Sequence, residues 1–507
     1  MYKEYKTMNA ARLAFSIFLG TSVSVFAATQ VRTEADLKNI SGAKCSDDII
    51  LMNDIRMSNS SFSPLCPNGF SGVFDGGNHT ITNLYISEDL VFHKNVAFVA
   101  ILKGGVLRNL TFENPIIEAH NYLLNVNGAS VAVAIGELEG GSVENVHVIG
   151  GEVSVNSLFG NATADAGGLV GTADSGAVSE SGGEIDVSNT GSRNGTVGGI
   201  CGSITGDVTL SSVTYSGNVT EVVGSVDSDA TLTSKYGAVT LSQTRSANSA
   251  VIDGEYTGED SIKIMTDVSV NSVVLNRSFV ENTMSTLMLP FSIDTSKVKG
   301  AKIYRFKRVD VDEETGVWKV VIGRIYTPQV GANTPYLVLP TADKMTFEGP
   351  VTFNTTTSPL ENVNGLEEGS SWEFKGVYAH TEFDEVQEDG PMYAFAGQNK
   401  DGVKVGQFKK IGSGVKAYPM QAYLVNHGGN VAAKSARASL GHSVALPDVI
   451  DIEVEDENGI VVEAGRLDRG SGEVRMDRWF DLKGRKLNSK PSVKGTYYNN
   501  GKKVIIK

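Results

Sequence analysis

Acidic side chains between residues 75 and 174 are the residues of this sequence that come nearest to a catalytic set. A glycoside hydrolase needs two carboxyl groups facing each other across a groove, and a calcium-assisted lyase needs clustered carboxylates with a basic side chain. Glu137 and Glu139 stand two positions apart, so on a strand both would face the same side. The other candidates are Asp75, Glu113, Glu118, Glu144, Asp165 and Asp174. A carbohydrate-active enzyme, a polysaccharide lyase or hydrolase, is therefore one alternative, and calcium binding stays open.

Other catalytic signatures are missing from the sequence. It contains no H-E-x-x-H, G-x-S-x-G or G-x-x-x-x-G-K-[ST] motif, which removes the usual marks of zinc proteases, serine esterases and phosphate-binding loops. The seven histidines are scattered and do not have the i, i+4 spacing of a helical metal site: His79, His93, His120, His147, His380, His427 and His442. We expect no catalytic residue set, no cofactor and no metal site of this kind.

The elements that would position these side chains are four glycine-punctuated repeats between Ala97 and Tyr215. Ala100, Gly136, Gly171 and Gly202 align with one another, and their numbers differ by 36, 35 and 31 (136 − 100, 171 − 136, 202 − 171). Such a period is typical of stacked repeat architectures. An upstream stretch that ends in Asn83-Leu84 is echoed by Asn109-Leu110 and Asn145-Val146, which indicates a preceding coil.

These repeats predict an all-β protein built on a right-handed parallel β-helix. Apolar and polar residues alternate with period two, so each strand has one inward face, and stacked coils share one core. Gly136, Gly171 and Gly202 are expected at the corners, where a positive φ would let one wall bend into the next. The alternative fold is an antiparallel β-sandwich with glycine-rich hairpins.

Composition sets limits on the partners. The chain has 507 residues, 56 of them glycine, and a net charge of −14. A strongly acidic chain without a Lys/Arg-rich patch is a poor nucleic-acid binder, because attraction to phosphate supplies most of that affinity. We expect no nucleic-acid partner.

Residues 1–27 have the features of a signal peptide. Lys3, Lys6 and Arg12 are followed by an apolar stretch that is shorter than the roughly 20 residues of a spanning helix, and Val25-Phe26-Ala27 fits a cleavage site before Ala28. Met8 is an alternative start. These residues predict export through the inner membrane.

Three cysteines in a long exported chain do not form a disulfide framework. Cys45 and Cys66 could close a loop at the start of the first coil. Cys201 replaces a branched aliphatic residue in the fourth repeat, so we interpret it as a core residue and not as a nucleophile. A helix-like pattern from Val31 to Ile40, with Thr33 as its N-cap, is the expected cap of the β-helix.

Changes in composition divide the chain into six segments. They are a signal peptide (1–27), a β-helix with its N-terminal cap (28–222), a transition or degraded coils (223–261), a β-sandwich module (262–428), a linker (429–447) and a terminal block (448–507). In the terminal block, carboxylates that include Asp451, Glu453 and Glu455 largely alternate with aliphatic residues and are expected on a strand or its edge, where charge discourages edge pairing. Asn500-Gly501 predicts a hairpin.

Three parts of the sequence resemble known families. Gly168-Leu169-Val170-Gly171 and Gly199-Ile200-Cys201-Gly202 resemble the GLUG motif of secreted and surface proteins, which implies a rod or scaffold. From Arg277 to Leu424, a series of short sequence motifs resembles a sandwich module found beside the solenoids of Gram-negative surface proteins. One of these motifs is Thr286-Leu287-Met288-Leu289-Pro290-Phe291.

The terminal block resembles the C-terminal sorting domain of the type IX secretion system. The positions that match are Asp481, Gly484, Arg485, Gly495, Tyr497 and Lys507. This resemblance implies a small immunoglobulin-like sandwich, the type IX secretion machinery as a partner, and a location at the cell surface or outside the cell. One departure is the Asn499-Asn500-Gly501 hairpin, where an apolar residue is expected soon after the tyrosine.

A binding or adhesion surface fits these features better than catalysis. A wall of Ser, Thr, Asn and Asp offers regularly spaced hydrogen-bonding groups that suit an extended polysaccharide or a partner surface. The aromatic candidates for such a wall are Tyr85, Phe112, Tyr122, Phe159 and Tyr215. A purely structural surface spacer is the third alternative.

Overall fold

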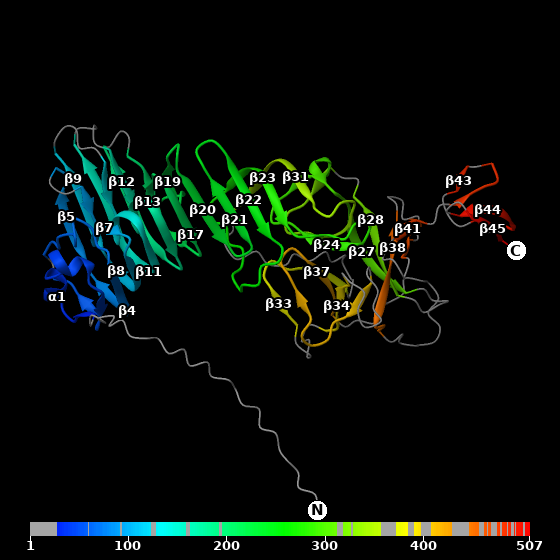
Figure 1. The fold of residues 1–507 in the computed structure, drawn as a ribbon, viewed down its shortest axis with the longest axis horizontal. Helices are drawn as coiled ribbons and strands as arrows, with labels where there is room; N and C mark the ends of the chain where they lie inside the picture. Colours follow the sequence, from blue (N-terminus) through cyan, green and yellow to red (C-terminus); the bar gives the residue numbers. More distant parts are fainter. Residues whose placement is uncertain are drawn as a thin grey trace, which may run out of the picture.

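The computed structural model is an elongated all-β molecule whose solenoid leads into a sandwich and a small terminal sheet (Figure 1). The structure describes residues 28–58, 60–91, 94–122, 128–158, 163–191, 195–311, 318–325, 328–355, 372–383, 390–396, 407–427, 446–455, 461–463, 465–467, 474–476, 479–483, 485–487, 491, 493–499 and 502–506. The predicted signal peptide (1–27) and most of the predicted linker (429–447) lie outside these residues.

A parallel β-helix occupies the N-terminal half of the molecule, which confirms the predicted fold and rules out a sandwich for this part. Each strand pairs in parallel with the equivalent strand of the next coil. In chain order the strands are β1 (Thr29–Val31), β2 (Ile49–Leu51), β3 (Ile55–Arg56), β4 (Val73–Thr82), β5 (Tyr85–Asp89), β6 (Asn95–Val96), β7 (Val99–Lys103), β8 (Val106–Glu113), β9 (Ile116–Asn121), β10 (Ala129–Val131), β11 (Ile135–Ser157), β12 (Ala164–Gly167), β13 (Val170–Ser179), β14 (Gly182–Thr190), β15 (Val197–Gly198), β16 (Cys201–Ile204), β17 (Asp207–Ser211), β18 (Thr214–Ser216), β19 (Val223–Val226) and β20 (Thr231–Tyr236).

The register of these strands matches the repeat alignment. Ile135 lies opposite Val99 on one side and Val170 on the other, and Val170 lies opposite Cys201. Ala100, Gly136, Gly171 and Gly202 therefore form one column. The column continues to Gly224, because Cys201 lies opposite Val223. Strands β19 and β20 thus continue the parallel ladder into residues 223–261, as degraded coils would.

One continuous apolar core fills the solenoid. Phe98 packs edge to face against Phe74 of the preceding coil and Phe112 of its own coil, with ring centroids 5.4 and 5.3 Å away, so aromatic contacts link neighbouring coils inside the core. Cys201 is 1% exposed, and burial raises the pKa of its thiol to about 12. This protonated, inaccessible thiol confirms the interpretation of Cys201 as a core residue.

The predicted role of Gly136, Gly171 and Gly202 as positive-φ corners is wrong. None of the three has a positive φ. A Cβ on each would instead lie 2.6–2.7 Å from the carbonyl oxygen of the residue one coil earlier in the same column. These glycines are needed because two backbones approach closely at the junction of two walls.

The positive-φ corner holds a different column of residues. It runs through successive coils and consists of Asn78, Asn109, Asn145, Glu180 and Ser212, with φ between 50° and 60°. Asn83, which the sequence comparison matched with Asn109, lies at the next corner beside Asn114. Asparagine tolerates the left-handed region better than most residues, which explains its repeated use here.

The N-terminal end of the solenoid is covered by helix α1 (Glu34–Lys38). Thr33 and Asp36 form a capping box, and Leu37 is fully buried against the first coils. A 3-10 helix (Gly42–Ser46) carries Cys45, which forms a disulfide with Cys66. The predicted cap is confirmed, and both devices protect the open edge and core of the first coil.

At the other end the solenoid sheet changes from parallel to antiparallel. Strand β20 pairs antiparallel with β21 (Val239–Gln243), and β21 with β22 (Asn248–Asp253). Strand β23 (Val268–Asn276) then adds in parallel, and β31 (Thr346–Phe353) antiparallel. The sandwich module therefore continues the sheet of the solenoid and covers its last coil (Figure 1).

A second sheet completes the module. Its order is β24 (Ser285–Met288), β30 (Pro335–Pro340), β27 (Ala301–Val311), β28 (Trp318–Arg324), β38 (Val449–Glu455), β35 (Phe408–Lys410), β34 (Met392–Phe395), β37 (Ala422–Asn426) and β32 (Trp372–Gly376), with β39 (Val461–Glu463) beside β38. The acidic residues of the terminal block lie on a strand, as predicted, but the edge alternative is wrong, because β38 is hydrogen-bonded on both sides. The first strand of the terminal block thus belongs to the sandwich.

Smaller elements flank these sheets. They are β25 (Ile293–Asp294) with β29 (Gln329–Val330), a 3-10 helix (Thr295–Lys297), β26 (Val298–Lys299), β33 (Thr381–Glu382) with β36 (Lys416–Ala417), and β40 (Gly465–Leu467) with β41 (Val474–Met476). The C-terminal sheet has the order β43 (Lys486–Leu487), β42 (Trp479–Phe480), β44 (Gly495–Asn499) and β45 (Lys502–Ile506). Strands β44 and β45 pair antiparallel, as the hairpin signal predicts.

Candidate binding face

One outer wall of the solenoid combines aromatic, acidic and hydroxyl side chains. We call it the polar wall and define it as the outward side chains of β5, β9, β14 and residues 152–157 of β11. Its rows run across the coils: Tyr85, Ile116, Glu152 and Asp186; Ser87, Glu118, Ser154 and Ser188; Asp89, His120, Asn156 and Thr190. The alternate residues, such as Ile117 and Val153, are fully buried. The strand period therefore fixes which side chains face outward.

An aromatic pair lies at one edge of the polar wall. The rings of His120 and Tyr122 stack with their centroids 5.6 Å apart and an angle of 13° between their planes. Tyr122 is 49% exposed, so one of its faces is open to a ligand. A flat exposed ring of this kind stacks on the C–H face of a sugar, and its hydroxyl supplies a hydrogen bond.

Glu118 links this pair to the neighbouring coil. The hydroxyl of Tyr85 donates a hydrogen bond to Glu118 Oε2 over 3.1 Å, and His120 Nε2 lies 3.8 Å from the same oxygen. The carboxylate keeps further lone pairs that can accept from ligand hydroxyls. Tyr85 and His120, from two coils, thus flank one acceptor carboxylate, and His120 also stacks on the exposed Tyr122 ring.

The polar wall is acidic. Its strands, residues 85–89, 116–121, 152–157 and 182–190, contain neither Lys nor Arg. The outward carboxylates are Asp89, Glu118, Glu152, Glu184 and Asp186. Like charges repel, so this face disfavours polyanions and suits neutral or amine-bearing ligands.

The other candidate carboxylates are held by separate local partners. Asp75 pairs with Arg108 at 2.9 Å, Glu113 accepts from Thr82 at 3.1 Å, and Glu144 accepts from Ser142 at 2.7 Å. Burial alone would raise the pKa of Asp75, but hydrogen bonds from the Gly77 amide, Asn109 and Arg108 lower it overall. A general acid needs a raised pKa, so Asp75 does not suit that role.

Glu137 and Glu139 both stabilise the charged form of Lys103. Lys103 Nζ is 2.9 Å from Glu139 Oε2, and the pKa of Lys103 is raised mainly by Glu139 and also by the charge of Glu137. Glu137 accepts from Asn95, and Asp165 accepts from Ser203 and Thr196. Within the described residues, none of the eight candidate carboxylates is hydrogen-bonded to another. No group of three His, Cys, Asp or Glu placed to hold a metal ion occurs in that part either.

The aromatic candidates separate into core and surface residues. Phe112 is fully buried, and the hydroxyl of Tyr215 donates to the Ile185 carbonyl over 3.1 Å. Phe159 lies outside the described residues. Of the described members of this set, Tyr85 and Tyr122 face outward at the polar wall. His120 was missed because a single histidine on a strand gives no signal, although the spacing His120-x-Tyr122 places both rings on one face.

The remaining histidines have ordinary surface contacts. His79 Nδ1 lies 3.0 Å from Asp54, His147 Nε2 lies 3.1 Å from Asn145, and His427 Nε2 lies 2.5 Å from Glu373. The ring of His380 packs against Tyr418. His93 and His442 lie outside the described residues.

The proposed sorting motif contains a closed turn. Asp481 Oδ1 accepts hydrogen bonds from the amides of Lys483 and Arg485, and Asp481 Oδ2 pairs with Arg485 Nε at 2.8 Å. Tyr497 donates to the Val493 carbonyl over 3.0 Å, and Gly495 begins β44. Gly484 and Lys507 lie outside the described residues. The described members of the motif thus stabilise a turn and a strand.

No family model and no curated protein matches this chain. One solved structure, described as that of a "putative immunoglobulin A1 protease" from Bacteroides ovatus, has a TM-score of 0.28 and 17% identity, over 40% of this chain and 69% of that one. A likeness at this level carries no argument about this chain. Among the described residues, no helix is long and apolar enough to cross a membrane.

Proposed function

We propose that this protein is exported to the cell surface, where its polar wall binds an extended polysaccharide or a partner's surface. The observation that carries the proposal is the exposed Tyr122 ring, stacked on His120, whose Nε2 lies 3.8 Å from the Glu118 carboxylate. Sugar recognition needs this combination of a flat apolar ring and nearby hydrogen-bond acceptors. The wall extends the same pattern over several coils, which suits a long polymer.

Binding without turnover is the expected behaviour. The candidate carboxylates are dispersed over different walls. They form ion pairs with Arg108 or Lys103, or accept hydrogen bonds from neutral donors, so a pair of carboxyl groups across a groove is not supported. A β-helix carbohydrate-active enzyme and a purely structural spacer are the two rival functions.

A polysaccharide-binding assay separates the three functions. The full chain is tested on a glycan array and in pull-downs with insoluble cellulose, and reducing-sugar release is measured in parallel. Retention without sugar release supports the proposal, and sugar release supports the enzyme. Absence of both supports the spacer.

Two tyrosine variants test whether the polar wall is the binding face. Tyr122→Ala should weaken binding about fivefold, because stacking on an aromatic ring contributes about 1 kcal/mol. Tyr498→Ala is the matched control, since Tyr498 is also an exposed tyrosine, at 38%, but lies in the C-terminal sheet. Equal affinity of the Tyr122→Ala and wild-type proteins would place the binding site elsewhere.

Surface display by the type IX secretion machinery is the second part of the proposal. It is supported by the resemblance of residues 479–507 and by the turn that Asp481 and Arg485 close. Deleting residues 479–507 should leave the protein in the periplasm, whereas Tyr122→Ala, which changes only the solenoid, should not. Normal surface display of the deletion variant would refute this route.

A further inference from the structure

Strand β38 joins two halves of the sandwich sheet. On one side it pairs in parallel with β28, where Lys319 lies opposite Asp451 and Gly323 opposite Glu455. On the other side it pairs antiparallel with β35. The path of hydrogen-bonded strands from β24 to β32 passes through β38. Without it, β28 and β35 would each have an open edge, which is a template for another strand.

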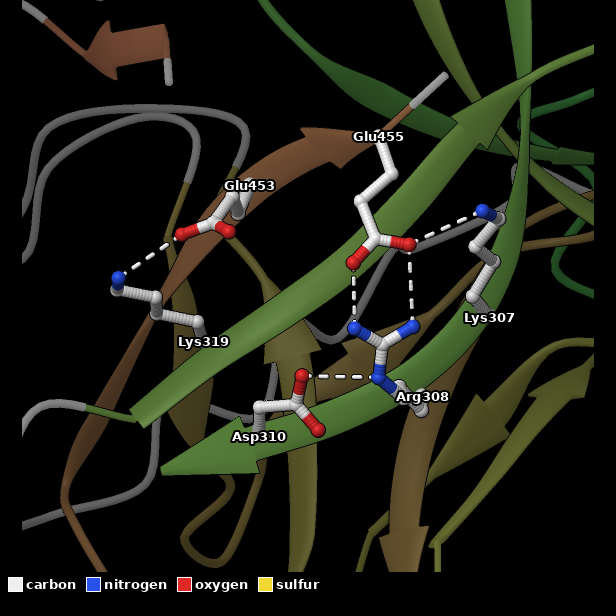
Figure 2. Close-up of polar contacts among 6 residues, drawn as sticks. All are labelled: Lys307, Arg308, Asp310, Lys319, Glu453 and Glu455. Atoms are coloured by element: carbon white, nitrogen blue, oxygen red, sulfur yellow. Dashed lines mark hydrogen bonds and ion pairs between the residues drawn. The ribbon is translucent and has the colours of Figure 1, made fainter. Parts of the chain in front are cut away.

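The space between β28 and β35, which we call the slot, selects its strand by charge. Arg308 makes a bidentate pair with Glu455, with Nη1 3.1 Å from Oε2 and Nη2 on Oε1 (Figure 2). Lys307 Nζ lies 3.0 Å from Glu455 Oε2, and Lys319 Nζ lies 2.8 Å from Glu453 Oε2. Only 5% of the Glu455 side chain is exposed. Three cations of the slot thus meet two carboxylates of one strand.

Two backbone features near the slot allow basic side chains of β27 to reach Glu455. A bulge between Phe306 and Arg308 allows Lys307 and Arg308, which are adjacent in sequence, to reach the same carboxylate. Both side chains must cross β28 to do so, and Lys307 crosses it at Gly323, where an added Cβ would lie 2.9 Å from Lys307 Cε. Asp310 holds the Arg308 guanidinium from below, with Oδ2 2.8 Å from Nε (Figure 2).

Apolar contacts hold the other face of β38. Ile450 is fully buried and Val454 is 8% exposed, in the same core as Trp318 and Tyr393. The hydroxyl of Tyr393 donates to the Pro447 carbonyl over 2.9 Å, at the entry of the strand. The slot therefore recognises both faces and the start of this one strand.

A second copy of the chain can present the same strand. In chain order β37 ends at Asn426 and β38 begins at Val449. The intervening segment, 427–448, can span up to about 75 Å when extended. The contacts inside the slot do not depend on which copy supplies the strand, so exchange between two copies would be reciprocal and symmetric.

We propose that the slot is a strand-binding site for β38, filled within one chain or reciprocally between two copies, which makes a strand-exchanged dimer on the displaying surface. Its partner is thus a second copy of this chain, recognised through Glu453, Glu455 and the apolar face of β38.

Complementary charge reversal tests the exchange with full-length chains. Arg308→Glu and Glu455→Arg each place like charges in the slot, so neither chain can fill its own slot well. When the two variants are refolded together, each slot finds its opposite charge in the other copy, and a 1:1 dimer of twice the monomer mass should be recovered by light scattering. The double variant in one chain is the control, because it can close its own slot and should be mostly monomeric.

A cross-link gives an independent measurement if the charge variants fold poorly. Lys319→Cys in one copy and Asp451→Cys in a differently tagged copy bring two thiols opposite each other only after exchange. An intermolecular disulfide between the two tags, absent when either variant is refolded alone, supports the proposal. A mixture that stays monomeric and forms no disulfide overturns it.

Discussion

The side-chain amide of Asn145 donates a hydrogen bond to the side-chain oxygen of Asn109, 3.0 Å away in the preceding coil. Both residues occupy the left-handed corner, with φ of 53°. Asn109 in turn donates to Asp75 one coil earlier, over 3.1 Å. A short ladder of side chains therefore joins three coils at a corner where the backbone is strained for most residues.

Asn145→Ala should destabilise the solenoid by about 2 kcal/mol. About half of this is the cost of a left-handed alanine and the rest is the lost hydrogen bond. Asn145→Gly keeps the backbone relaxed and loses only the side-chain contacts, so its loss should be about 1 kcal/mol. Urea unfolding followed by circular dichroism measures both. Equal loss in the two variants would contradict the strain argument.

Glu180→Gly should stabilise the same corner. Glu180 has a φ of 50°, a left-handed conformation that glutamate tolerates less well than asparagine. Glycine adopts this conformation without a steric cost. The gain in unfolding free energy is expected to be about 1 kcal/mol. Glu184→Gly is the control, since Glu184 lies on a nearby strand without a positive φ, and should lose stability. A loss in both variants would show that the corner tolerates glutamate without strain.

Gly171→Ala should destabilise the solenoid by about 3 kcal/mol, because the new Cβ would overpack a junction of two backbones. It would lie 2.7 Å from the Gly136 carbonyl oxygen and 2.7 Å from the Val131 amide nitrogen. Gly412→Ala is the matched control, since nothing lies within 4 Å of the added atom there. Thermal unfolding of both variants tests this, and a Gly171→Ala protein of wild-type stability would contradict the close approach.

The solenoid could be predicted from sequence because its signal is repeated. The inward residues Val99, Ile135, Val170 and Cys201 recur at one place in each coil, so their alignment led to the correct register. The corners could not be assigned, because glycine serves both a positive φ and a close approach. Glu180 and Ser212 carry no corner signal at all, and only neighbouring coils show that they share the column of Asn145.

The sites were predicted less well, because they depend on pairs that are distant in sequence. Tyr85 and Tyr122 were named as aromatic candidates from the sequence, but their relation to Glu118 and His120 requires the register of β5 on β9. The alternation around Glu455 predicted a strand or its edge, but it could not show which charges the carboxylate meets. Its partner Arg308 lies 147 residues away, and no local pattern connects the two.

The packing of β38 should become less stable at acidic pH, because Glu455 must be ionised to pair with Arg308 and Lys307. Its hydrogen bonds with Arg308, and secondarily with Lys307, lower its pKa below the ordinary value of 4.5, although burial opposes this. A group with a lowered pKa in the folded state stabilises the fold above the unfolded-state pKa. That contribution is lost as the pH falls from about 4.5 through the folded-state value.

Glu455→Gln tests this titration directly. It should cost about 3 kcal/mol at pH 7, because Arg308 and Lys307 would face a neutral amide, and the difference from the wild type should shrink as the pH falls below 4.5. Urea unfolding from pH 7 to 3, followed by tryptophan fluorescence, measures this, since Trp318 and Trp372 lie in the core beneath β38. Glu382→Gln is the control, because Glu382 pairs with Lys416 at the surface, where an ion pair contributes little. A Glu455→Gln deficit that stays constant down to pH 3 would mean that the carboxylate does not carry the stability of the slot.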